Sequence, residues 1–149
     1  HMRIEGLLSL EANMNLKDPQ TYLNFFAVVE DLKKQTMDFI EKVRADGKTI
    51  WGYGASTKGN TLLQWYGLNE THIDGIAERS EMKYGKKTAG SNIPIFSEEH
   101  VRNNKPDYML VLPWHFINEF KYREREYLEN GGAFIVPCPK FEIITKDDL

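Results

Sequence analysis

The chain has 149 residues and a formal net charge of −3, a length that suits one domain and a charge that gives no electrostatic reason to expect a nucleic-acid partner. Its single cysteine, Cys138, excludes an internal disulfide and any zinc motif that needs two thiolates, so a reducing, cytoplasmic setting is expected. No apolar run approaches the roughly 20 residues of a membrane span, and the N-terminus lacks the pattern of a signal peptide, so no membrane partner is expected.

The first 18 residues are expected to precede the folded domain. His1-Met2 is interpreted as a remnant of cloning, which suggests that the natural chain is longer. Residues 3–18 show no clean hydrophobic period and are interpreted as a linker. A single domain is therefore predicted over residues 19–149.

A long amphipathic helix is predicted to open this domain. Asp18 and Pro19 form a helix-start signal in which Asp is the cap and Pro takes the first helical position. From there apolar residues recur at helical spacing, with charged residues between them, until Gly47 ends the pattern. This helix is expected either to pack across the following sheet or to contact a segment upstream.

Strands and helices are predicted to alternate in the rest of the chain. Strands are expected at 49–54, 73–77, 107–113 and 133–137, a short extended piece at 93–96, and helices at 57–66, 97–104 and 116–130. Continuously apolar strands separated by helices predict an α/β, Rossmann-like fold with a mostly parallel sheet and helices on both faces. Right-handed crossovers place the second and third of the four strands on opposite sides of the first, and ligands bind in such sheets at that crevice.

The stretch TIWGYGASTKGN, residues 49–60, places Gly52 and Gly54 at the predicted strand-to-helix turn. Gly59 follows Gly54 by five residues, whereas the dinucleotide fingerprint has its third glycine three residues on, and the stretch does not fit a P-loop either. Two interpretations remain open. The glycines either cradle a phosphate or only let the helix and strand pack closely.

Two charged residues near this turn suit a nucleotide. A cation in the first turn of a helix opposes the helix dipole, so Lys58 suggests a bound anion such as phosphate, although its side chain could equally extend into water. Glu78 ends the second strand, where dinucleotide folds place a carboxylate that binds ribose hydroxyls. The charges in the loop over residues 80–91 are explained equally well by exposure to solvent.

The third main strand ends in Trp114 and His115, on the same edge of the sheet as the glycine turn. Trp114 either stacks on a base or sugar or caps the core. His115 either hydrogen-bonds a phosphate, or acts as an acid or base, or is simply a residue at a helix N-terminus. His72 and His100 have no partner at ligand spacing, so no metal site is expected, and no self-sufficient catalytic motif is visible.

Four sequence blocks then occur in a characteristic order: GYGASTKGNTLLQWYGL, IPIFSEEHV, PDYMLVLPWHF and GGAFIVPCP. Over residues 22–143 they resemble the C-terminal domain of the S-adenosylmethionine-dependent C-methyltransferases that act on nucleotide-linked deoxysugars. In that family a zinc-binding N-terminal domain and a central methyl-donor-binding domain precede this one. The resemblance implies a Rossmann-like domain that helps to bind a nucleoside diphosphate sugar, while S-adenosylmethionine and the catalytic base belong to the central domain.

The resemblance also implies a set of substrate-binding residues. The family's glycine-turn and strand-end blocks match Gly52, Tyr53, Gly54, Ala55, Lys58, Gly59, Asn60, Trp114, His115 and Phe116, and we add Glu78 from its position after the second strand. No cofactor is expected to bind this domain itself, because the first strand carries no acidic-x-Gly-x-Gly-x-Gly pattern. The catalytic residues cannot be assigned from these blocks.

Three functions are carried forward. The first is the substrate-binding domain of a sugar C-methyltransferase that lacks its methyl-donor domain here and is not catalytically complete alone. The second is a free-standing binder of a dinucleotide or adenosine, favoured by Gly52, Gly54 and Glu78. The third is a docking module whose long N-terminal helix binds a partner and whose crevice is degenerate.

Overall fold

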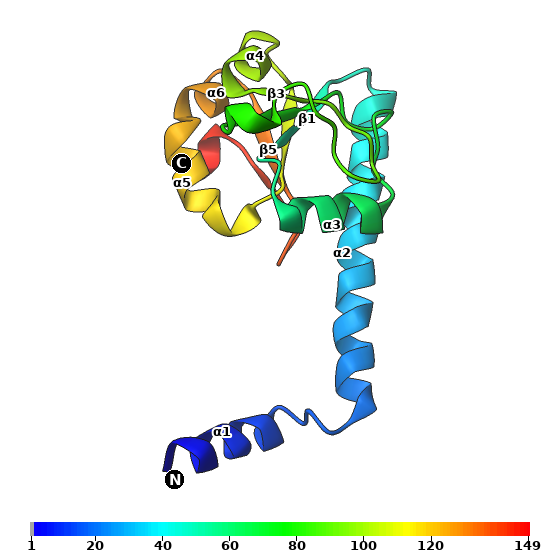
Figure 1. Cartoon of the computed structure of the whole chain (residues 1–149), viewed down its shortest axis with the longest axis vertical. Helices are drawn as coiled ribbons and strands as arrows, with labels where there is room; N and C mark the ends of the chain where they lie inside the picture. Colours follow the sequence, from blue (N-terminus) through cyan, green and yellow to red (C-terminus); the bar gives the residue numbers. More distant parts are fainter. Residues whose placement is uncertain (1) are drawn as a thin grey trace.

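A six-stranded sheet forms the centre of the computed structural model, which describes residues 2–149 (Figure 1). Its strands are β1 (Ile50–Tyr53), β2 (Ile76–Glu78), β3 (Ile95–Ser97), β4 (Tyr108–Val111), β5 (Ala133–Val136) and β6 (Glu142–Ile144). They lie in the order β3-β2-β1-β4-β5-β6, and neighbours are parallel except for the antiparallel pair of β5 and β6. The predicted α/β fold with a mostly parallel sheet is confirmed, and β2 and β4 flank β1 as right-handed crossovers require.

Helices cover both faces of this sheet (Figure 1). They are α1 (Met2–Asn13), α2 (Pro19–Ala45), α3 (Thr57–Tyr66), α4 (Glu98–Asn103), α5 (Ile117–Arg123) and α6 (Arg125–Glu129), joined by the short 3-10 helices η1 (Glu81–Lys83), η2 (Trp114–Phe116) and η3 (Lys146–Asp148). On one face, α2 and α3 bury Ile40 and Leu63 against the sheet. On the other face, α4, α5 and α6 bury Val101, Phe120 and Leu128 in a second core.

The helix ends follow local chemistry. The side chains of Asp18, Ser56 and Ser97 each accept a hydrogen bond from a backbone N–H in the first turn of α2, α3 and α4, at 2.9, 3.0 and 3.1 Å. Such caps satisfy donors that have no partner within the helix. The caps predicted at Asp18 and Ser97 are confirmed, and α3 ends at Gly67, whose φ of 76° is left-handed.

Towards the C-terminus, two stretches differ from the expectation from sequence. The single helix predicted over residues 116–130 is divided into η2, α5 and α6, with a break at Glu124, where φ is −104° and ψ is 27°. The Glu124 side chain is buried there and hydrogen-bonds to Tyr53 and Arg102, so the break turns a carboxylate inward. The strand β6 was not predicted, because three residues are too few to show a strand period.

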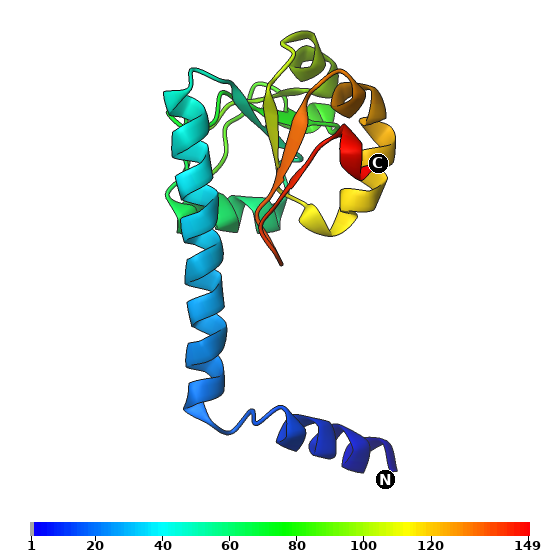
Figure 2. The ribbon, with the colours of Figure 1, turned by 180° about the vertical axis from the view of Figure 1, so that it is seen from behind.

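An arm of residues 2–30, formed by α1 and the N-terminal half of α2, projects from the body (Figures 1 and 2). The buried residues of α2, Thr36, Ile40 and Val43, all lie in its other half. Large apolar side chains are exposed along the arm at Ile4, Leu7, Leu8, Leu10, Met14, Tyr22, Leu23, Phe25, Phe26 and Val28. No helix in residues 2–149 is long and apolar enough to cross a bilayer.

The arm changes the expectation for the N-terminal residues. The sequence predicts a linker without helical period over residues 3–18, but α1 is helical there. The apolar side chains of α1 do not pack on the core. Its sequence therefore lacks the narrow apolar stripe by which a core-facing helix is recognised. The arm contacts the body at Phe26, whose ring centroid lies 5.8 Å from that of Trp65.

The arm and the body border an open space. The helix α2 runs on past the edge of the body at which α3 begins, and α1 turns back on the side where the body lies (Figures 1 and 2). That edge of the body is formed by the carboxyl ends of the parallel strands, because α3 starts directly after β1. The predicted ligand edge of the sheet therefore faces this space.

Candidate functional site

The turn that joins β1 to α3 lies against the end of β4. Gly54 has a left-handed φ of 82°, and a Cβ there would lie 2.7 Å from Cγ of Pro113. A Cβ on Gly52 would meet a side chain of β2, and a Cβ on Gly59 would meet Cβ of Leu112. Close packing thus requires all three glycines, whether or not the turn also binds an anion.

Glu78 fixes this turn to the end of β2. Its Oε2 accepts hydrogen bonds from the Ala55 backbone N–H at 2.8 Å and from Nζ of Lys83 at 3.1 Å. Its Oε1 accepts from the backbone N–H groups of Arg79 and Ser80, at 3.0 and 2.9 Å. Burial raises the pKa of Glu78, but these donors outweigh it and hold the pKa below its usual range. Both carboxylate oxygens are therefore bound to protein donors, and the contact with a ribose stays a prediction.

A pocket of about 240 Å³ opens beside the start of α3. Its apolar wall comes from α3, β3 and the end of β4, and its polar wall from the glycine turn and the loop after β2. The lining residues are Ala55, Ser56, Thr57, Asn60, Leu63, Lys83, Thr88, Ala89, Ile95 and Leu112. Of the residues predicted to bind substrate, the pocket brings together Ala55 and Asn60.

Asn60 lines this pocket and carries a side-chain oxygen without a hydrogen-bond partner in residues 2–149. Its Oδ1 is buried and accepts no hydrogen bond from any residue in the described part of the chain. Its backbone N–H is already bound to the carbonyl of Ser56 at 2.9 Å, as the helix requires. Buried polar atoms in folded proteins almost always have a partner, so this oxygen is an exception among the described residues.

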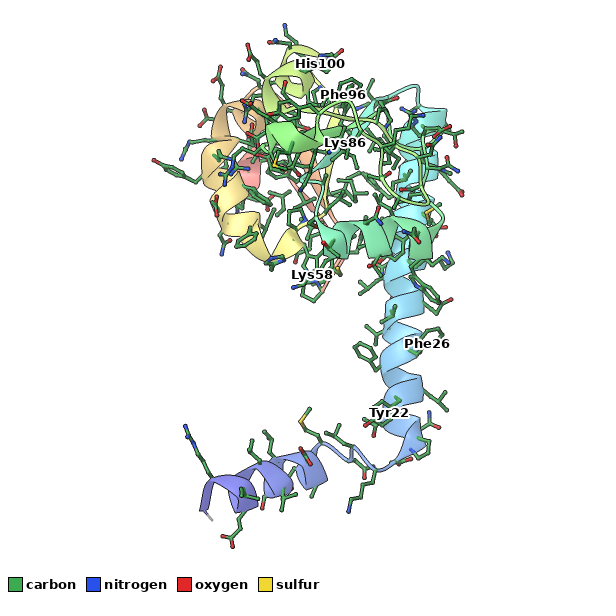
Figure 3. All side chains as sticks on the ribbon, viewed as in Figure 1. Tyr22, Phe26, Lys58, Lys86, Phe96 and His100 are labelled. Carbon is green, nitrogen blue, oxygen red and sulfur yellow. The ribbon has the colours of Figure 1, made fainter. Side chains whose placement is uncertain are left out.

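Lys58 lies at the edge of the body that faces the arm (Figure 3). Its side chain is exposed, and no carboxylate within residues 2–149 forms an ion pair with it. It does not line the pocket but sits in the same first turn of α3 as Thr57, which does. The cation therefore stays opposed to the helix dipole unless an anion binds beside it.

The Tyr53 side chain lies on the other face of the sheet from the pocket. It belongs to the core formed by α4, α5 and α6, and it is 1% exposed. Its hydroxyl donates to Oε1 of Glu124 at 2.6 Å and accepts from Nη2 of Arg123 at 2.7 Å. Burial, followed by the Glu124 carboxylate, raises the pKa of Tyr53 well above its usual value. The Tyr53 side chain thus packs under the α4, α5 and α6 face of the sheet and does not face the pocket.

The strand-end residues divide between core and surface. Trp114 is half-buried and packs against both cores, as in the core-capping interpretation. His115 is exposed, and its ring centroid lies 4.2 Å from that of Phe116. Neither Trp114 nor His115 lines the pocket, so their contact with substrate stays a prediction.

The loop after β2 supplies residues that sequence reasoning did not assign to the site. Lys83 donates to the Ala55 carbonyl at 2.9 Å as well as to Glu78. Further along, Gln64 of α3 donates from Nε2 to the Ala89 carbonyl at 2.9 Å, which holds this loop over the helix. The sequence signal that could have indicated the ion pair is Lys83, which follows Glu78 at the end of β2 by five residues.

Comparison with known proteins identifies the fold's family. Residues 1–139 match the family described as the C-methyltransferase C-terminal domain. The chain belongs to this family. The resemblance seen in the four sequence blocks is confirmed.

A longer relative agrees with this assignment. The chain is 39% identical over 144 residues to the C-methyltransferase NovU of Streptomyces niveus. The aligned region covers 97% of this chain and 34% of NovU. This C-methyltransferase C-terminal domain therefore spans about a third of the length of the curated relative it matches. No group of three or more His, Cys, Asp or Glu side chains within the described residues is arranged to hold a metal ion.

Proposed function

We propose that this domain binds the nucleotide-sugar substrate of an S-adenosylmethionine-dependent C-methyltransferase, while an upstream domain binds the methyl donor. The observation that carries the proposal lies at the carboxyl edge of the sheet. There Lys58, which is exposed and pairs with no carboxylate of residues 2–149, and the pocket-lining residues Thr57 and Asn60 share the first two turns of one helix. A free cation beside a pocket whose own lysine, Lys83, is paired with Glu78 suits a ligand with an anionic and a neutral part.

The phosphates are assigned to the start of α3. The N–H groups in the first turn of a helix have no partners within it, and the helix dipole favours negative charge at that end. The Ser56 hydroxyl occupies the N–H of Gly59, which leaves those of Thr57 and Lys58 for a ligand. Together with the positively charged Lys58 ammonium beside them, these N–H donors form a site that suits a negatively charged diphosphate.

The domain supplies binding and orientation rather than the methyl group. In C-methyl transfer, S-adenosylmethionine supplies an electrophilic methyl group to a carbon nucleophile. We assign that cofactor, and the base that generates the nucleophile, to the upstream domain. The residues of the C-terminal domain hold the nucleotide sugar so that its reacting carbon faces the upstream domain. The proposal places the enzyme in the cytoplasm, where Cys138 stays a thiol.

The dinucleotide alternative finds less support. The spacing of Gly54 and Gly59 follows from packing against the end of β4, and the four protein donors on Glu78 leave little for ribose hydroxyls. Thermal unfolding with NAD or S-adenosylmethionine tests this alternative. A rise in the midpoint with either ligand would favour it.

The arm favours docking as a second role of the same domain. Leu23 and Phe25 on α2 are 60% and 69% exposed, and the large apolar side chains of α1, such as Leu7, are exposed as well. Exposed apolar surface of this extent is typical of an interaction site. We assign the arm to the methyl-donor-binding domain, because a domain bound there would occupy the open space beside the edge that carries Lys58 (Figure 3).

Calorimetry of the 149-residue chain with UDP-glucose and dTDP-glucose tests the substrate assignment. Lys58→Ala is expected to weaken binding about tenfold, as for loss of a charged hydrogen bond. Lys17→Ala, which removes an exposed cation from the arm, is the matched control and is expected to change nothing. No heat at millimolar ligand, with or without an added donor-binding domain, would contradict the proposal.

The arm is tested by pull-down of a separately produced donor-binding domain. The double variant Leu23→Ser/Phe25→Ser is expected to lose this association while it keeps its affinity for UDP-glucose or dTDP-glucose. Tyr122→Ser removes an equally exposed aromatic side chain from α5 and serves as the control. If the same double variant only abolishes self-association in sedimentation, the arm binds a second copy of the chain instead.

A further inference from the structure

Lys83 lines the pocket beside α3, although its ammonium is also bonded to the protein. Its Nζ donates to the Ala55 carbonyl at 2.9 Å and to Oε2 of Glu78 at 3.1 Å. An ammonium group has three N–H donors, so these two bonds leave one N–H of Lys83 without a partner in residues 2–149. The Lys83 side chain can therefore bind a ligand while it keeps its contacts with the turn.

The ion pair of Lys83 and Glu78 presents its positive member to the pocket. The Lys83 side chain is 43% exposed, whereas that of Glu78 is 11% exposed and does not belong to the pocket lining. Both oxygens of the Glu78 carboxylate are bound, because the backbone N–H groups of Ala55, Arg79 and Ser80 donate to them as well. A ligand in the pocket thus meets the ammonium of this pair and not the carboxylate.

Thr57 adds two donors to the same pocket. Its backbone N–H lies in the first turn of α3 and has no partner in residues 2–149, as is usual at a helix start. Its hydroxyl donates to no acceptor within these residues, and only its backbone carbonyl accepts a side-chain hydrogen bond, from Thr61. The unpartnered Oδ1 of Asn60 is buried, so it offers no acceptor at the pocket surface. Thr57 and Lys83 thus make the pocket wall rich in free hydrogen-bond donors.

The segment that carries Lys83 is held in place. The Gly85 N–H donates to the Ile95 carbonyl at 3.0 Å, and the Ile95 N–H donates to the Lys86 carbonyl at 2.9 Å, so the loop is bonded to the edge strand β3. Together with the bond from Nζ to the Ala55 carbonyl, these contacts fix the backbone beside Lys83 and the tip of its side chain. A donor that is fixed in advance loses less conformational entropy on binding than a mobile lysine does.

Lys58 and Lys83 both lie close to Thr57. Lys58 follows Thr57 in the first turn of α3, outside the pocket lining, and Lys83 lines the pocket together with Thr57. Each phosphate of a nucleotide sugar carries a negative charge near pH 7, so a diphosphate is matched better by two cations than by one. Charged donors and the free N–H groups of a helix start are the groups that bind phosphate best.

We propose that Lys83 is the second cation of the diphosphate site, and that the phosphates lie at the start of α3 between Lys58 and the pocket wall that carries Lys83. This rests on the proposed function and extends its site from the helix start into the pocket. The ammonium of Lys83 donates to a phosphate oxygen and keeps its bond to Glu78. Thr57 donates to the phosphates from its N–H and its hydroxyl.

Calorimetry of the 149-residue chain with inorganic pyrophosphate, UDP-glucose and dTDP-glucose tests this assignment. Lys83→Met keeps the length of the side chain but not its charge, and is expected to weaken each ligand about tenfold. Lys83→Arg is expected to keep most of the affinity. Glu78→Gln breaks the same ion pair but keeps the cation, so it is expected to weaken binding less than Lys83→Met does. Lys86→Met removes an exposed cation of the same loop from outside the pocket lining, and is the matched control.

Ionic strength separates a ligand contact from a structural role. Salt screens the attraction between charges, so the affinity for pyrophosphate is expected to fall as salt is added. This fall is expected to be smaller in Lys83→Met than in the unmodified chain, and to be unchanged in Lys86→Met. Equal weakening by Lys83→Met and Glu78→Gln, with an unchanged dependence on salt, would leave Lys83 a structural role alone and would overturn the inference.

NMR of the unmodified chain gives a readout that needs no variant. Pyrophosphate is expected to shift the side-chain Cε signal of Lys83 as well as that of Lys58. A shift at Lys58 without a shift at Lys83 would overturn the inference and leave the proposed function in place. Absence of all binding to the unmodified chain would instead overturn the proposed function together with the inference.

Discussion

The Glu78 carboxylate accepts a hydrogen bond of 2.8 Å from the Ala55 backbone N–H, and so ties the end of β2 to the turn between β1 and α3. The same carboxylate pairs with Lys83, whose ammonium returns to the Ala55 carbonyl at 2.9 Å. The turn is therefore held through both its N–H and its carbonyl. This arrangement gives Glu78 a structural role at the edge where the ligand is proposed to bind.

Glu78→Gln is expected to destabilise the fold by about 1–3 kcal/mol, because an amide is a weaker acceptor and its NH₂ meets protein donors. The free energy of unfolding in urea measures this loss. Glu81→Gln, which changes an exposed carboxylate three residues away, is the matched control and is expected to leave the midpoint unchanged. Equal stability of the two variants would show that the bonds of Glu78 contribute little.

Acid is expected to destabilise the domain through the same carboxylate. The pKa of Glu78 is lower in the folded than in the unfolded state, so its contribution is present above the unfolded value of about 4.3 and is lost as pH falls through the folded value. Asp107 adds to this effect, because the N–H of Thr49, at 2.9 Å, is the main cause that lowers its pKa.

The measurement is the urea midpoint at a series of pH values. Stability is expected to be nearly constant between about pH 7 and 6 and to fall below about pH 4.5. Glu78→Gln is expected to show a smaller fall, because it has no proton to gain. An equal fall in the variant and the unmodified protein would assign the acid sensitivity to other carboxylates.

Much of the fold could be predicted from local signals. The helix α3 has the predicted bounds because Ser56 caps its start and Gly67 ends it. The order of β1, β2 and β4 follows from the handedness of crossovers. By contrast, β2 begins at Ile76 and not at Ile73, because Ile73 is buried in a loop before the strand and its apolar side chain mimics a strand residue.

The candidate site was harder to predict for a physical reason. All four residues of β1 are buried, so no alternation of polar and apolar residues indicates which face Tyr53 takes. The partners of Glu78 come from a loop without a period, so the sequence could place the carboxylate at the strand end but could not show that protein donors surround it. The unpartnered oxygen of Asn60 is likewise a property of three-dimensional packing.

Tyr53→Phe is expected to lower stability by about 1–3 kcal/mol and to leave nucleotide-sugar affinity unchanged. The variant deprives buried Glu124 of its 2.6 Å hydrogen bond, whereas the ring that packs against Phe120 is kept. Urea unfolding and calorimetry with UDP-glucose or dTDP-glucose give the two readouts. Tyr122→Phe, on an 85% exposed side chain, is the control for the loss of a hydroxyl. If Tyr53→Phe bound ligand more weakly at full stability, this would contradict the placement of its side chain on the face of the sheet opposite the pocket.

Gly59→Ala tests whether packing alone requires the late glycine of the turn. A methyl group there would meet Cβ of Leu112 at the end of β4, so α3 would have to move away from the sheet. Such overpacking is expected to cost about 1–3 kcal/mol, although alanine favours a helix more than glycine does. Gly6→Ala in α1 is the matched control, because no atom lies within 4 Å of its added methyl group, and it is expected not to lower stability. Urea unfolding compares the two, and a Gly59→Ala variant as stable as the unmodified domain would leave anion binding as the better reason for this glycine.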